Sequence, residues 1–179
     1  YITDATKCYE FTVNLGSSTN TDDAEGEVIK SSKKRPSDAE IVEGLQKFLG
    51  DIMQIPPQFS AVKIGGQRAY KLERAGEDIE IAARHVFVED LSLVDRPSKD
   101  TAVLDMTCSK GGYVRSIARD LGEVLGCYGH VAKLRRLWSG PFDLEYAISL
   151  DQVESFAKTS KIDQFLRPLE EGLTDLPHG

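Results

Sequence analysis

Apolar and polar residues alternate strictly in one early stretch of the chain, residues 9–15. Tyr9, Phe11, Val13 and Leu15 are separated by polar residues, which is the two-residue period of a half-buried strand. The stretch therefore predicts a strand. Further strand-like segments follow at 27–29, 79–81, 85–94 and 101–108.

Two other stretches carry the spacing of helices. Ser37 and Glu40 form a capping-box pattern ahead of apolar residues at helical spacing, and Gly50 is predicted to end that helix. A second helix is predicted after residue 112 and ends at Gly126, with an apolar face of Val114, Ile117, Ala118, Leu121 and Leu125. A short helix is predicted between the glycines of 65–76, and the proline pair at 56–57 predicts an extended segment.

Together these elements predict an α+β fold with a mostly antiparallel sheet. Helices are expected against one face of the sheet, and a substrate cleft is expected across the other. The length of 179 residues, with 40% hydrophobic and 28% charged residues, fits one globular unit rather than a disordered or fibrous chain.

Composition bears on the cellular location of the protein, the state of its cysteines and metal binding. No stretch approaches the roughly 20 apolar residues of a membrane span, and the first residues lack a secretory pattern, so a cytoplasmic protein is expected. Cys8, Cys108 and Cys127 are too widely spaced for a disulfide framework or a zinc ribbon, which predicts reduced, mostly buried thiols. The three histidines have no metal-binding spacing, so no metal is expected.

Positive charge is concentrated in one segment of a chain whose net charge is -7. Residues 108–138 carry six basic and two acidic side chains. Such a segment can present a local phosphate-binding face, although a solvated helix face gives the same charge pattern.

A strand-to-helix turn at Lys110, Gly111 and Gly112 is the strongest local chemical signal. Two glycines allow a close backbone approach, and the helix N-terminus beyond them favours an anion, with Arg115 and Arg119 adding positive charge. The turn is neither a Walker A loop nor a dinucleotide-binding fingerprint. A tight connection without a ligand remains the alternative.

A second basic patch, residues 133–137, alternates leucines with basic residues. The pattern predicts leucines anchored in the core and arginines turned outward, where an arginine pair suits phosphate. A surface edge strand protected by charge is the alternative.

Three segments of the chain resemble consecutive blocks of the bacterial TruB-type tRNA pseudouridine synthases. They are KCYEFTVNLGSSTNTDDAEGEVI, IPPQFSAVKIGGQRAYKLERAG and CSKGGYVRSIARDLGEVLGCYGHVAKLRRL, in the family's order over roughly residues 1–155. The resemblance implies that uridine at position 55, in the T loop of tRNA, is converted to pseudouridine. The base is extracted from its loop, its glycosidic C–N bond is broken, and it is rejoined through carbon without cofactor or metal.

The resemblance also assigns site residues. Tyr9 matches the tyrosine that stacks on the target ring and is a candidate for late proton abstraction, and Arg115 matches the arginine that pairs with the catalytic aspartate. The remaining matches are Tyr113 and Leu134 at the flipped uracil, Lys110 as a phosphate or structural contact, and Asp23 as a loop aspartate near the site. A core aromatic is the alternative for Tyr9, and a surface ion pair for Arg115.

One block of the family pattern does not occur in this sequence. The nucleophilic aspartate of the family lies in a Gly-Ala/Thr-Leu-Asp-Pro block before the KxY strand, and Asp4 does not stand in such a context. We therefore expect the chain to be a fragment that is inactive alone, with the nucleophile encoded before Tyr1.

The resemblance further divides the chain. Residues 1–155 correspond to part of the catalytic domain, within which 55–83 correspond to a mobile thumb segment that closes over RNA. Residues 156–179 correspond to an extension toward a PUA-like RNA-binding domain. The expected partner is the T-arm stem-loop of tRNA, and the expected state is a monomer.

Two other functions stay open on the sequence alone. The first is a non-catalytic RNA-binding or RNA-chaperone module that never had a nucleophile. The second is a phosphate-metabolite enzyme that uses the Gly-Gly turn, which would show no salt-dependent binding of tRNA.

Overall fold

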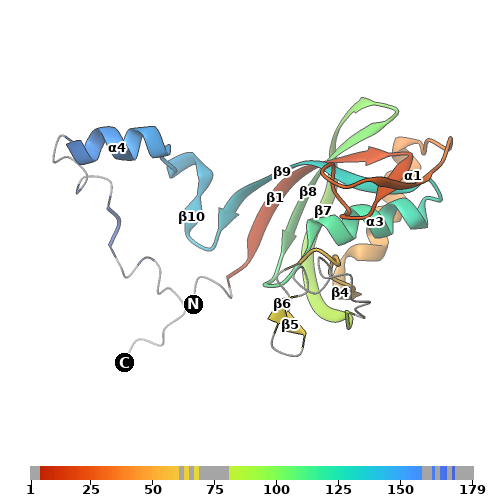
Figure 1. Ribbon diagram of the computed structural model, residues 1–179, viewed down its shortest axis with the longest axis horizontal. Coiled ribbons are helices and arrows are strands. Elements are labelled where there is room, and N and C mark those ends of the chain that lie inside the picture. Colours follow the sequence, from red (N-terminus) through yellow and green to blue (C-terminus); the bar gives the residue numbers. More distant parts are fainter. Residues whose placement is uncertain are drawn as a thin grey trace.

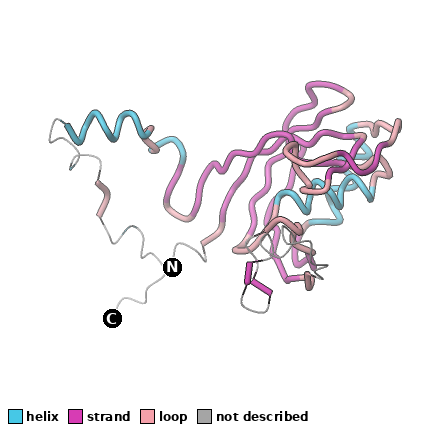
Figure 2. Tube along the Cα trace, viewed as in Figure 1, coloured by secondary structure: helices cyan, strands magenta, loops and turns pink. Residues whose placement is uncertain are grey.

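The centre of the molecule is a six-stranded sheet in which every neighbouring pair is antiparallel. The computed structural model describes residues 5–60, 63–64, 67–68, 81–158, 163, 166–168 and 171. Figures 1 and 2 show the sheet running through the middle of the molecule. In sheet order its strands are β10 (Phe142–Asp143), β9 (Gly129–Ser139), β1 (Lys7–Leu15), β8 (Thr101–Cys108), β7 (Arg84–Ser98) and β4 (Gly50–Gln54).

The alternation seen in the sequence separates the two faces of this sheet. In β8, Ala102, Leu104, Met106 and Cys108 are buried, while the residues between them are only partly buried. The predicted strand at 9–15 is confirmed as β1, whose Phe11 pairs with Leu104. Side chains of paired residues lie on the same face, so the apolar positions of neighbouring strands form one continuous layer.

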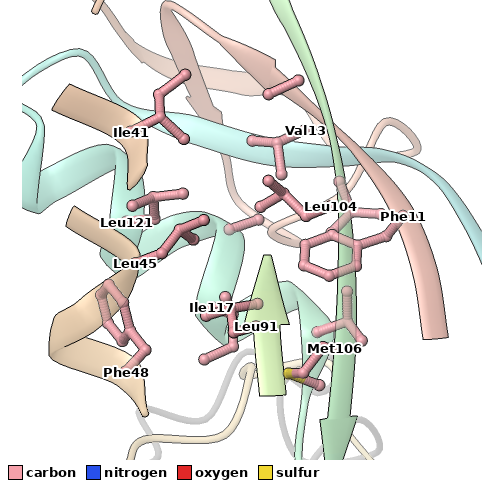
Figure 3. Close-up of a cluster of buried hydrophobic side chains, with 14 of the residues drawn as sticks. Phe11, Val13, Ile41, Leu45, Phe48, Leu91, Leu104, Met106, Ile117 and Leu121 are labelled. Carbon is pink, nitrogen blue, oxygen red and sulfur yellow. The ribbon is translucent and has the colours of Figure 1, made fainter. Parts of the chain in front are cut away.

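Two helices cover that apolar layer. The helix α1 (Asp38–Leu45) contributes Ile41 and Leu45, and α3 (Val114–Val124) contributes Ile117 and Leu121. Figure 3 shows these side chains facing Phe11 and the other apolar residues of the sheet. The predicted α+β class with a mostly antiparallel sheet is confirmed.

The start of α1 follows the sequence pattern, but its end does not. The Ser37 side chain accepts from the backbone of Glu40, and the Glu40 carboxylate accepts from the backbone N–H of Ser37, which confirms the capping box. The α-helix stops at Leu45, and a 3₁₀ turn, η1 (Gln46–Phe48), follows. Gly50 has φ +76° and opens strand β4, which the sequence analysis missed.

Of the short elements that the sequence predicts, one strand is confirmed and one helix is wrong where it can be compared. The return strand predicted at 27–29 is confirmed as β3 (Val28–Ser31), which pairs with β2 (Ser17–Thr19). A helix predicted over 65–76 is wrong where it can be compared, because β6 (Gln67–Arg68) pairs with β5 (Lys63–Ile64). Its residues 69–76 lie outside the described residues, as do 79–80 of another predicted strand.

The C-terminal elements lie away from the sheet. After the 3₁₀ turn η2 (Leu144–Tyr146), the helix α4 (Leu150–Lys158) stands apart from the body in Figure 1 and has no buried residue. No helix in the described part of the chain is long and apolar enough to cross a membrane. The three cysteines are free and buried, as predicted.

Close packing between α3 and the start of β9 depends on one glycine. The carbonyl of Gly122 accepts from the N–H groups of Cys127 and Tyr128, and a Cβ at Gly122 would overlap backbone atoms of Tyr128 and Gly129. The chain then turns at Gly126, with φ +65°, which confirms the predicted end of the helix.

We expect Gly122→Ala to destabilise the fold by about 2 kcal/mol, because the new methyl group meets backbone that cannot move without displacing α3 from β9. Urea unfolding measures the change. Glu123→Ala, on the exposed side of the same helix, is the control and should change the free energy of unfolding by no more than about 0.5 kcal/mol. Equal effects of the two variants would show that this contact does not position α3.

Candidate functional site

The N-terminus of α3 is fixed by a buried glutamine from β4. The backbone N–H of Tyr113 donates to Oε1 of Gln54 at 2.8 Å, and Nε2 of Gln54 donates to the Tyr113 carbonyl at 3.1 Å. Ser116 donates from its hydroxyl to the carbonyl of Ile55 at 2.7 Å. These bonds pair the N–H of Tyr113 and the carbonyl of Ile55 with side chains. The Tyr113 carbonyl, which also accepts from the N–H of Ile117, gains a second donor.

Arg115, on the first turn of α3, joins three segments. Its Nη1 lies 3.0 Å from Oδ2 of Asp23 and 3.3 Å from the carbonyl of Thr21, and its Nη2 donates to the carbonyl of Phe59 at 2.9 Å. Both charged side chains of the ion pair are about one quarter exposed. The guanidinium is therefore held between the 19–26 loop and the segment that follows β4.

Arg119 repeats this arrangement one helical turn later. Its Nη1 lies 3.1 Å from Oδ2 of Asp22, its Nε 2.8 Å from Oδ1 of Asp120, and its Nη2 2.8 Å from the carbonyl of Ile55. Asp22 is buried and has φ +61°. Burial raises the pKa of Asp22, and the charge of Arg119 opposes that rise.

A pocket of about 450 Å³ opens beside Arg115. One wall comes from the 19–26 loop and the other from β9, and the lining residues are Asp23, Ala24, Glu25, Arg115, Val131, Ala132, Lys133 and Leu134. Leu134 is 52% exposed there. The combination of a held cation, a carboxylate and an exposed apolar side chain suits a planar polar ring.

The position of Leu134 corrects the prediction that leucines of the 133–137 patch are anchored in the core. Two β-bulges in β9 set the face on which Leu134 lies, because Leu137 and Ala132 are extra residues opposite β1. Between them the register pairs Leu134 with Phe11, on the side of the sheet that the helices cover. Leu134 is exposed on that face because it lines the open pocket. Bulges re-aim side chains in this way next to functional sites.

Tyr9 lies on the same side of the sheet, next to the core. It is half-buried, packs against the core cluster, and pairs with Met106 on β8 and Arg136 on β9. Burial raises the pKa of the Tyr9 phenol, the neighbouring Cys108 adds to the rise, and Arg136 opposes it. These residues do not lie on the face opposite the helices, where the cleft was expected. Tyr9 and Leu134 lie on the helix side and Arg115 belongs to α3, but Tyr9 is not among the residues that line the pocket.

The remaining predicted residues lie around the same helix start. Tyr113 is the N-cap of α3 and is partly exposed, and Lys110 lies in the exposed turn before it, where Gly111 has φ +88°. Neither lines the pocket beside Arg115. Within the described ranges, no group of three or more metal-ligating side chains is present.

The sequence pattern did not single out Asp22 or Gln54, and it predicted Arg136 only as one of an arginine pair suited to phosphate, not as a neighbour of Tyr9. A usable signal existed for the first, because the adjacent acids at 22–23 complement two arginines spaced four residues apart on a helix. Gln54 had no such signal, since its role depends on where β4 meets α3.

Arg119→Ala should destabilise the protein by about 2 kcal/mol near pH 7, because it leaves the buried carboxylate of Asp22 without its cation. Without Arg119, the pKa of Asp22 in the folded variant rises further above its value in the unfolded chain. The folded variant therefore favours protonated Asp22, and it loses stability as rising pH removes that proton. The penalty should therefore shrink toward about pH 4.

Urea unfolding of Arg119→Ala at the two pH values measures this change. In the double variant Asp22→Asn/Arg119→Ala, the penalty should become nearly independent of pH. A penalty that stays constant in the single variant would show that Asp22 is not the group that Arg119 compensates.

Two family models match consecutive parts of the chain. The TruB family pseudouridylate synthase N-terminal domain matches residues 1–114, and the tRNA pseudouridylate synthase B C-terminal domain matches residues 115–174. The border between them lies within α3, while β9 of the second region pairs along β1 of the first.

Curated relatives agree with these matches. The chain is 68% identical over 177 residues to tRNA pseudouridine synthase B of Ruegeria pomeroyi, with 99% of the chain and 58% of the relative covered. It is 44% identical over 179 residues to the protein of the same name from Anaplasma phagocytophilum, with 99% and 60% covered. The chain thus spans about three fifths of the length of these relatives.

Solved structures show the same fold at lower identity. A crystal structure of a Cbf5-Nop10-Gar1 complex matches 94% of this chain and 43% of that chain with a TM-score of 0.67 and 22% identity. An H/ACA RNP bound to a substrate RNA containing 2'-deoxyuridine matches 96% and 42% with a TM-score of 0.65 and 18% identity. With a family model matched over 1–114, the chain belongs to the TruB family of pseudouridylate synthases.

Proposed function

We propose that the complete protein converts a uridine of tRNA to pseudouridine, and that this chain supplies the cationic, aromatic and apolar parts of the active site. The observation that carries the proposal is the pocket beside Arg115, where a held guanidinium faces the exposed side chain of Leu134. The names of the curated relatives support the same activity.

Arg115 retains donors for a further anion. An arginine has five N–H donors, and the contacts to Asp23, Thr21 and Phe59 use both hydrogens of Nη1 and one of Nη2. Among the described residues, none accepts from the Nε–H or the second Nη2–H, which are left to pair with a carboxylate. We propose that this carboxylate is the nucleophilic aspartate, contributed by residues outside this chain, because no Gly-Ala/Thr-Leu-Asp-Pro block occurs in it.

In this reaction, three residues of the chain have separate roles. Arg115 keeps the aspartate ionised and aimed, since an opposite charge at close range favours the carboxylate. Leu134 supplies an apolar contact for the extracted uracil, and Tyr9 stacks on the ring. The bond from the sugar C1′ to the uracil N1 breaks with its electron pair on N1, and a bond from C1′ to C5 forms. A base then removes the proton of C5, with the ionised phenol of Tyr9 as the candidate, and N1 takes up a proton.

The substrate in this proposal is the T-arm stem-loop of tRNA, modified at position 55, and the enzyme acts as a cytoplasmic monomer without metal or cofactor. Tyr113 contacts the flipped uracil, Lys110 contacts a phosphate or braces the turn, and Asp23 orients Arg115. Residues 1–155 form part of the catalytic domain, 55–83 close over the RNA, and 156–179 lead toward an RNA-binding region.

In the complete protein, Arg115→Ala should lower kcat for pseudouridine formation by about 100-fold and change tRNA affinity by less than about threefold. The guanidinium stabilises charge during the reaction rather than binding the RNA. Single-turnover conversion of a tRNA transcript and filter binding measure the two effects. Lys47→Ala, which removes a positive charge from η1 outside the site, is the control, and unchanged turnover in Arg115→Ala would contradict the role.

Binding to tRNA should weaken as salt rises, with log K falling by about 0.7 to 0.9 per log unit of salt for each neutralised phosphate. Fluorescence anisotropy with a labelled T-arm stem-loop measures the slope. Salt-dependent binding without conversion by the complete protein would favour the non-catalytic RNA-binding module. Absence of binding would favour a metabolite enzyme.

A further inference from the structure

The two neighbouring arginines of β9 pair with residues on opposite faces of the sheet. Cys8 pairs with Trp138, but the next residue of β1, Tyr9, pairs with Arg136, because Leu137 is the extra residue of a bulge. Arg135 consequently pairs with Glu10. Without the bulge Tyr9 would oppose Leu137, and Arg136 would share a face with Glu10.

The bulge therefore brings a guanidinium to the tyrosine of the proposed site. Arg136 and Tyr9 are cross-strand neighbours on the helix side of the sheet, and the guanidinium is close enough to lower the pKa of the phenol. Directly opposed residues in an antiparallel pair have Cβ atoms within about 5.5 Å. Arg136 is exposed, so the contact lies at the open side of the half-buried ring.

We propose that Arg136 is a positioning residue for Tyr9, and that its guanidinium, placed opposite Tyr9 by the bulge at Leu137, holds the phenol at the open side of the site. A guanidinium can donate to a phenol oxygen and favours its ionised form, so this pairing gives Arg136 a direct effect on Tyr9. The catalytic consequence rests on the proposed function, but the contact itself does not.

The groups around Tyr9 shift the pKa of its phenol, and this pKa can be measured. Among the described residues, the titratable and charged groups that act on the phenol are Cys108 from β8 and Arg136 from β9. Burial and Cys108 raise the pKa of Tyr9, whereas the hydrogen bond and charge of Arg136 lower it. Cys108 has its own pKa raised to about 11, so its thiol is neutral near pH 7. Removing Arg136 should therefore raise the pKa of the phenol.

The test uses the complete protein, without RNA, labelled with 3-fluorotyrosine, whose phenol ionises at lower pH than that of tyrosine. Fluorine NMR follows the ionisation, and the signal lost in Tyr9→Phe identifies Tyr9. In Arg136→Gln this signal should titrate at higher pH than in the wild type. In Arg136→Lys, which keeps the charge but not the planar fork, it should fall between them.

Arg135→Gln is the matched control, because it removes the same charge from the neighbouring position that pairs with Glu10. Its Tyr9 titration should coincide with that of the wild type. An unchanged titration in Arg136→Gln, or equal shifts in the two glutamine variants, would overturn the proposal.

Measuring the kinetics of pseudouridine formation separates this inference from the proposed function. If the complete protein forms pseudouridine, Arg136→Gln should lower kcat about tenfold, the factor that one hydrogen bond of ordinary strength supplies, with little change in KM. A rise in KM and a smaller salt slope, without movement of the Tyr9 titration, would make Arg136 a phosphate contact instead. If no pseudouridine forms, the fluorine titration still decides the Arg136 contact.

Discussion

The site depends on two ion pairs that connect the first turns of α3 with the 19–26 loop. Arg115 with Asp23 and Arg119 with Asp22 lie one helical turn apart, so the loop is held at two points rather than one. Each arginine also donates to a backbone carbonyl between residues 55 and 59. Three segments from separate parts of the chain thereby take fixed positions around one helix end.

The helix can serve as this anchor because its other side is part of the core. Ile117 and Leu121 pack into the apolar layer of the sheet, and Gly122 lets the start of β9 approach closely. A shift of α3 would therefore disturb the core and the site together. The same packing places the pocket between the 19–26 loop and β9, where Leu134 is exposed beside Arg115.

The strand β9 contributes a second constraint through its bulges. A regular strand would place alternate side chains of 133–137 on fixed faces, whereas two extra residues shift Leu134 and Arg136 to the side of the helices. The face on which Tyr9 lies does not depend on a bulge, because β1 pairs with β8 without interruption. The aromatic side chain is thus set by a regular strand, and its neighbours from β9 are set by an irregular one.

These differences explain what the sequence could predict. The strand at 9–15, the capping box at Ser37 and the helix that ends at Gly126 follow from local patterns, and all three are present. The face on which Leu134 lies was not predictable from the local pattern, because a bulge depends on the partner strand. The clamp of Gln54 on Tyr113 and the pairing of Asp22 with Arg119 depend on tertiary approach of distant segments.

The resemblance to the family supplied the candidate residues, and the structure gives their arrangement. Arg115, Asp23 and Leu134 line one pocket, while Tyr9 lies on the same face of the sheet and Tyr113 caps the helix that carries Arg115. We propose that this arrangement forms part of a pseudouridine synthase active site whose nucleophile is contributed from outside these residues.

The most direct test is carbodiimide adduct mapping of an unmodified tRNA transcript after incubation with the complete protein and, separately, with these 179 residues. We expect a pseudouridine-specific stop at the T-loop uridine with the complete protein and none with the shorter chain. A stop produced by the shorter chain would place the nucleophile within it, and no stop with a folded, tRNA-binding complete protein would contradict the claim of catalysis.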